Sequence, residues 1–141
     1  ELVAGGADPQ WISENIYEND PPQKIKLLAR ALETLNLDMA QKISSMVVTQ
    51  KAMQETGASY DHTEGFVDVI RSVNGVEVAV LYSQLKENYF KLSLRSKGKV
   101  NVEKVARLFG GGGHFNAAAC RIEGDIEEIK TRVNRAITGA N

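Results

Sequence analysis

The sequence predicts an α/β fold, in which helices pack on a mixed β-sheet that follows an N-terminal helical linker. Three observations support this class. Apolar residues recur at helical spacing near both ends of the chain. Apolar and polar residues alternate in its middle, as they do in half-buried strands. Helical and strand patterns also follow one another instead of falling into separate blocks, which is the order of a layered α/β domain.

Two helices are predicted in the first 40 residues. The stretch "DPQWISENIYEND" has Asp8 as a helix cap and Pro9 in the first turn. The stretch "DPPQKIKLLARALETL" repeats this signal, with Asp20 as the cap and Pro21 as the first helical residue. We expect these two helices to form a connector.

Strand and helix signals alternate from residue 41 onward. "QKISSMVVTQ" predicts a strand, and "KAMQETGAS" predicts a short helix that ends at Gly57. "HTEGFVDVIRSV" predicts a helix capped by Thr63, although its β-branched residues leave a strand open. "GVEVAVLYSQLKENYFKLSLRS" predicts two strands joined by a turn near residues 86–88.

The second of these strands should have one apolar and one polar face. Its apolar residues are Phe90, Leu92 and Leu94, and its polar residues are Lys91, Ser93 and Arg95. We expect the apolar set to face the core and the polar set to share the opposite face. Beyond it, "NVEKVARLFG" predicts an amphipathic helix, and "AAACRIEG" suits a tightly packed strand or a helix–strand join. "DIEEIKTRVNRAI" predicts a final helix capped by Asp125.

The composition is that of an ordinary soluble domain. The chain has 141 residues, of which 43% are hydrophobic, enough for one domain or a small domain with an extension. Its formal net charge of −1 means that any basic binding site must be local. The lone Cys120 favours a reducing, cytoplasmic compartment. No apolar run approaches the roughly 18 residues of a membrane span, so we expect no membrane partner.

The stretch "FGGGGHFNAAAC", residues 109–120, is the first candidate for a binding site. Four glycines in a row, Gly110–Gly113, cost conformational entropy, and we expect a ligand rather than packing to explain them. Successive N–H groups can form a concavity for an anion, and His114 can donate to phosphate or stack on a base. Neither the triphosphate-binding loop nor the dinucleotide fingerprint matches. The alternative is a turn that only reverses the chain.

The stretch "SLRSKGK", residues 93–99, is the second candidate. Arg95 lies on the polar face of its strand, and a bidentate guanidinium suits phosphate oxygens. Ser96 follows it, and Lys97 and Lys99 add positive charge. Since a strand end and a loop one helix later can meet at one sheet edge, we expect this stretch and the glycines to converge. The alternative is a solvated basic turn.

The string "KLSLRSKGKVNVEKVARLFGGGGHFNAAAC" resembles the C-terminal DHH-associated domain of the DHH-family phosphoesterases. It is most similar to the oligoribonucleases (nanoRNases) that also dephosphorylate pAp, and to cyclic-dinucleotide phosphodiesterases. "HTEGFVDVIRSVNGVEVAVLY" matches the pattern upstream, and "GADPQWISENIYENDPPQKIKLLARAL" resembles the end of the catalytic domain and its linking helix. The resemblance implies a boundary: residues 1–40 end the catalytic domain and the linker, and residues 41–141 form the substrate-binding domain.

The resemblance also implies which residues bind substrate. The matching positions are Arg95 and Ser96 in the arginine–serine element, and Gly111, Gly112, Gly113 and His114 in the glycine–histidine element, which contacts phosphate and base. Lys97 and Lys99 are further candidates for phosphate contacts. No residue of this chain is expected to be catalytic. Ala119 departs from the family pattern, which usually has glycine there.

The resemblance implies two manganese ions in an N-terminal domain that this chain lacks. The chain has no Asp-His-His triplet, and Asp61-His62 is only a partial match. A two-metal site needs several carboxylate and imidazole ligands, and His62 and His114 are the only histidines. We therefore expect this chain to bind no metal and to hydrolyse nothing alone. Because it begins with Glu1, we expect it to be part of a longer, manganese-dependent hydrolase acting on short oligonucleotides or pAp-like nucleotides.

Two other classes of function also fit part of the sequence. A similar glycine–histidine domain ends alanyl-tRNA synthetases, where it helps with RNA binding and dimerisation. The second class is a structural, dimer-forming domain in which the glycines only turn the chain. The expected partners are a short single-stranded oligonucleotide or phosphorylated nucleotide and the catalytic domain of the same protein. A homodimer, and pyrophosphate or polyphosphate as substrate, are left open.

Overall fold

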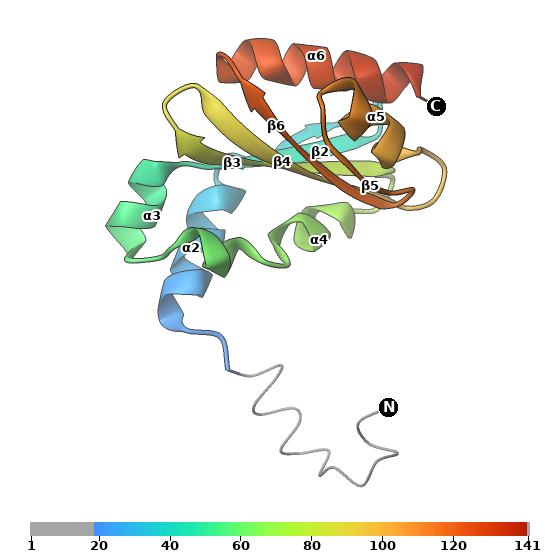
Figure 1. The fold of residues 1–141 in the computed structure, drawn as a ribbon. Coiled ribbons are helices and arrows are strands. Elements are labelled where there is room, and N and C mark those ends of the chain that lie inside the picture. The colour runs from blue at the N-terminus through green and yellow to red at the C-terminus, as the bar shows by residue number, and fades with distance from the viewer. Residues whose placement is uncertain (1–18, 141) are drawn as a thin grey trace, which may run out of the picture.

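The computed structural model describes residues 19–140, which form a six-stranded mixed sheet between two layers of helices (Figure 1). The strands are β1 (Asn36–Asp38), β2 (Ile43–Val48), β3 (Val78–Lys86), β4 (Tyr89–Ser96), β5 (Gly112–His114) and β6 (Ala117–Glu123). The helices are α2 (Pro22–Leu32), α3 (Gln50–Thr56), α4 (Phe66–Arg71), α5 (Val102–Leu108) and α6 (Ile126–Gly139), with a 3-10 helix, η2 (Tyr60–Thr63). The strand order is β1-β2-β3-β4-β6-β5. Only β2 and β3 pair in parallel within this sheet, so the predicted α/β class is confirmed.

The two helical layers cover unequal parts of the sheet (Figure 1). On one face, α5 and α6 enclose the larger core, to which β4 contributes Phe90, Leu92 and Leu94. On the other face, α2, α3 and α4 enclose a second core, whose strand residues come from β2 and β3. The alternation along β4 is thus confirmed, because its polar residues point to this second face.

On the second face, the part of the sheet formed by β4, β6 and β5 contributes no residue to the second core among the described residues. We call this part the open face. By strand register, its residues are Tyr89, Lys91, Ser93, Arg95, Ala117, Ala119, Arg121, Glu123, Gly112 and His114. The open face therefore carries the predicted arginine and the predicted histidine.

Most of the predicted elements are present. A strand, a helix ending at Gly57, two paired strands, an amphipathic helix, a strand and a final helix follow one another from β2 to α6. Asp125 caps α6, because its carboxylate accepts hydrogen bonds from the N–H groups of Glu127 and Glu128 at 3.1 and 3.3 Å. The helix predicted to begin near Asp8 lies outside the described residues.

The starts of two helices were predicted wrongly. Helix α2 begins at Pro22, and Asp20 pairs with Lys24 at 3.4 Å instead of capping the helix. Thr63 is the last residue of η2. Helix α4 begins after Gly65, whose φ of +85° interrupts helical geometry between η2 and α4. Two strands, β1 and β5, were not predicted, because three residues are too few to show an alternation.

Candidate functional site

Packing with β6 explains most of the glycine segment. Gly110 ends α5 with a φ of +82°, a conformation that favours glycine. A Cβ on Gly111 would overlap the backbone of β6 at Ala119, and a Cβ on Gly113 would lie 2.6 Å from the Ala117 carbonyl oxygen. The expectation that a ligand rather than packing explains the four glycines was therefore wrong for Gly111 and Gly113.

Gly112 is the exception in this segment. No atom lies within 4 Å of the position that its Cβ would take, and its φ is not in the left-handed region. Register pairs Gly112 with Ala119 of β6. Because neither packing nor backbone conformation requires a glycine here, Gly112 is the position where a close approach by a ligand would do so.

A two-residue turn, Phe115-Asn116, joins β5 to β6 and is fixed from two sides. The Phe115 carbonyl accepts a hydrogen bond from the N–H of Val102 at 2.9 Å. The Ser96 hydroxyl donates to the Asn116 side-chain oxygen at 3.0 Å, and the Ser96 N–H donates to the Asn116 carbonyl at 3.0 Å. Since Ser96 is only 2% exposed, it positions the turn. No role was predicted for Asn116, although asparagine in a tight turn was the available signal.

Strand register places Arg95 and His114 in one row across the open face. Arg95 of β4 pairs with Ala117 of β6, and Ala117 pairs with His114 of β5. Residues directly opposite each other in antiparallel strands point to the same face, and two strand spacings separate the outer backbones by about 10 Å. Only the methyl group of Ala117 stands between the two side chains in this row.

Most N–H donors of the Arg95 guanidinium have no acceptor among the described residues. Its Nη1 donates to the Leu94 carbonyl at 3.0 Å, and no ion pair among residues 19–140 includes it. Arg95 lines a cavity of about 330 Å³ with Lys91 and with the η2–α4 segment, which contributes Tyr60 and the acidic residues Asp61 and Glu64. A guanidinium in such a position can accept an anionic partner.

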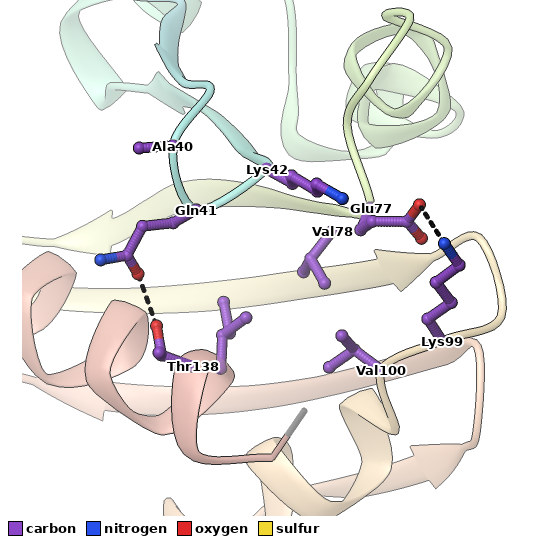
Figure 2. A pocket seen from close by; sticks show the side chains of 9 residues that line it. Ala40, Gln41, Lys42, Glu77, Val78, Lys99, Val100 and Thr138 are labelled. Carbon is purple, nitrogen blue, oxygen red and sulfur yellow. Dashed lines mark hydrogen bonds and ion pairs between the residues drawn. The ribbon is translucent and has the colours of Figure 1, made fainter.

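Lys97 and Lys99 lie outside this cavity. The Lys97 Nζ donates to the Val73 carbonyl at 2.9 Å. The Lys99 Nζ lies 3.8 Å from Oε1 of Glu77. Lys99 and Glu77 line a separate cavity of about 370 Å³ near the end of α6 (Figure 2). The two lysines remain predicted phosphate contacts, and the structure does not place them beside Arg95.

The described residues do not fit a metal centre. The His62 Nδ1 accepts a hydrogen bond from the Ser59 N–H at 3.0 Å, so His62 closes a local turn beside Asp61. Among residues 19–140, no three side chains of His, Cys, Asp or Glu gather closely enough to hold a metal ion. Burial raises the pKa of the Cys120 thiol to about 11, which keeps it protonated at neutral pH. No described helix combines the length and apolarity of a membrane span.

The fold and this row define an α/β domain with an arginine and a histidine in one row across the open face of its sheet. The chain belongs to the DHHA1 domain family, whose model matches residues 41–139.

Three known proteins are similar to it. The bifunctional oligoribonuclease and PAP phosphatase NrnA of Thermus thermophilus is 33% identical over 118 residues, which cover 83% of this chain and 35% of that protein. An exopolyphosphatase-related protein from Bacteroides fragilis has a TM-score of 0.87 at 23% identity, covering 97% of this chain and 40% of that one. The pGpG-specific phosphodiesterase PggH of Vibrio cholerae has a TM-score of 0.65 at 12% identity, covering 99% and 48%. The two structures show the fold, and the chain spans about a third of the NrnA protein.

Proposed function

We propose that this chain is the substrate-binding domain of a DHH-family hydrolase that acts on short oligonucleotides or pAp-like nucleotides. The observation that carries the proposal is the row Arg95–Ala117–His114, which lies on the open face of the sheet. Family membership and the similarity to an oligoribonuclease and PAP phosphatase support the class of substrate. We also propose that catalytic manganese ions belong to a part of the protein beyond this chain, because the described residues offer no set of ligands for them.

The chain's contribution is to position the substrate. Arg95 forms a bidentate pair with phosphate oxygens, using the donors that no carboxylate occupies. His114 donates a hydrogen bond to the same substrate or stacks on its base. The small Ala117 lets both contacts form on one molecule lying close to the sheet.

The supports behind this row make it rigid. Arg95 and His114 both lie on paired strands, and Ser96 and Asn116 hold the turn that follows His114. Preorganised contacts of this kind reduce the entropy cost of binding, and a substrate held in one orientation reacts faster when a second domain closes over it.

Nucleotide titrations test this proposal. The 141-residue chain and its Arg95→Ala variant would be titrated with pAp and with a 5′-phosphorylated diadenylate, while NMR follows the ring signals of His114. Loss of a charged hydrogen-bonding pair costs about 1.5–3 kcal/mol, so affinity should fall roughly tenfold to a hundredfold. Arg135→Ala is the matched control, because Arg135 is exposed on α6 behind the sheet. Absence of nucleotide binding by the wild-type chain would contradict the proposal.

The other classes of function remain predictions. Structural similarity below 25% identity shows the fold alone, so the likeness to PggH does not extend a cyclic-dinucleotide activity to this chain. The coding sequence upstream of Glu1 would separate the classes. An Asp-His-His motif there would favour the phosphoesterase, and an editing-domain metal motif would favour the synthetase.

A further inference from the structure

A second pair of basic side chains lies on the open face. Lys91 of β4 and Arg121 of β6 are direct partners in the strand register, so both point to the same face as Arg95. Lys91 lies four residues before Arg95 on the same strand, which separates the two rows by about 13 Å. The open face therefore has two cationic rows, one containing Arg95 and His114 and the other containing Lys91 and Arg121.

The space between the two rows has a low floor. It consists of one more register row, Ser93–Ala119–Gly112, in which no side chain is larger than serine. Two cavities lie beside this floor and share one lining residue, Lys91. The cavity of about 330 Å³ is lined by Arg95 and Ser93, the cavity of about 290 Å³ by Ala119 and Arg121, and Lys91 lines both. An extended ligand could thus lie across the floor and reach both rows.

The pairing of Lys91 with Arg121 is unfavourable without a partner. Like charges directly opposite each other on antiparallel strands destabilise a sheet. None of the ion pairs among residues 19–140 includes either residue, although six other lysines and arginines form them. Lys91 instead lies over the Tyr60 ring, with Nζ 5.4 Å from its centroid. An anion bound between the two charges would relieve their repulsion.

Protection of a sheet edge does not explain this pair. Lysine often discourages the edge strands of two sheets from pairing, but β4 and β6 are both interior strands here. Nor does composition explain it, because the chain is close to neutral overall. Carboxylates lie nearby, because Glu123 shares this face of β6 with Arg121, and Asp61 and Glu64 line the cavity of about 330 Å³ with Lys91. No ion pair among residues 19–140 joins any of them to Lys91 or Arg121. We therefore take the pair as a local site for negative charge.

We propose that Lys91 and Arg121 form a second phosphate subsite, so that the open face binds a single-stranded oligonucleotide of at least two nucleotides. One phosphate lies at Arg95 and His114, and the next part of the chain crosses the Ser93–Ala119–Gly112 floor to Lys91 and Arg121. This inference rests on the proposed function. It narrows the substrate class, because a nucleoside monophosphate can occupy only one row.

A series of ligands of increasing length tests the second subsite. AMP, 5′-phosphorylated diadenylate and 5′-phosphorylated triadenylate would be titrated into the wild-type chain, the Lys91→Ala/Arg121→Ala variant and a Lys130→Ala/Arg135→Ala control on α6. In the wild type, the longer ligands should bind at least about tenfold more tightly than AMP at low salt. The subsite variant should lose this gain, so that its Kd rises much more for the two longer ligands than for AMP. The slope of log K against log salt for the triadenylate should fall by about 1.4, as expected for two lost phosphate contacts.

Thermal unfolding separates binding from a structural role. Removing one of two repelling charges should leave the Tm of the free protein unchanged or raise it, so a lower Tm for Arg121→Ala would overturn the reasoning. The inference is also wrong if AMP binds but length brings no gain, or if the subsite variant keeps that gain. Failure of the wild type to bind any of the three nucleotides would instead sink the proposed function. Tetrapolyphosphate that binds as tightly as the triadenylate, with the same dependence on Lys91 and Arg121, would overturn the assignment to oligonucleotides.

Discussion

A methyl group added to Gly113 should destabilise the domain, whereas one added to its neighbour Gly112 should not. Gly113 has a φ of +146°, and its Cβ would lie 2.6 Å from both the Ala117 carbonyl oxygen and the Ala118 Cα. Both atoms are backbone, so β5 would have to move away from β6. Backbone strain costs on the order of 1–3 kcal/mol, and overpacking costs a similar amount. Gly113→Ala should therefore lose about 2–6 kcal/mol of unfolding free energy.

Urea unfolding followed by circular dichroism measures this loss, with Gly112→Ala as the matched control. Gly112 has an ordinary φ and free space at its Cβ position. Its substitution should change the unfolding free energy by less than about 1 kcal/mol, and stabilisation is the expected direction. Gly112→Ala should nevertheless weaken diadenylate binding, because its methyl group would stand on the floor of the open face. Equal losses of stability for the two variants would refute the reasoning.

Three further predictions concern the interior. Tyr82→Phe should leave the Tm unchanged or raise it, because the Tyr82 hydroxyl is buried with no hydrogen-bond partner among the described residues; a lower Tm would count against this reading. Ser96→Ala should cost about 0.5–1.5 kcal/mol in urea unfolding, because the hydrogen bond to Asn116 is lost while water can still reach the exposed Asn116 side chain. Ser93→Ala on the open face should cost much less, and similar losses would contradict the role given to Ser96. The unfolding free energy should fall as the pH rises above about 9, because burial raises the pKa of Cys120 from 9.0 to about 11. The unfolded chain then releases the thiol proton before the folded chain does, so urea titrations from pH 8 to 11 should show a smaller fall for Cys120→Ala.

The sequence was most informative where a pattern repeats. Alternation along β4 correctly separated the buried Leu92 and Leu94 from the half-buried Ser93 and Arg95, because a strand turns successive side chains to opposite faces. Asp125 was recognised as a helix cap because capping depends only on residues two or three positions away. Such features are local and need no knowledge of the fold.

Features that depend on pairing between distant residues could not be predicted. Strand β5 has only three residues, two of them glycines, and its place is set by the close fit of Gly113 against β6. The hydrogen bond from Ser96 to Asn116 joins residues 20 positions apart. The juxtaposition of Lys91 and Arg121 likewise exists only once β4 and β6 have a register. The sequence therefore indicated the candidate site as a set of residues, while its layout in rows came from the sheet.

The sheet ends in a three-residue strand on each side, β1 and β5. Outermost strands present backbone groups that another chain can pair with, and this is a common route to aggregation. A strand of three residues gives an incoming chain few hydrogen bonds and a poorly defined register. The domain can therefore expose the edge beside His114 to a ligand while offering other polypeptides little to extend. The short length of β5, which prevented its prediction from the sequence, therefore also limits the pairing of this edge with strands of other chains.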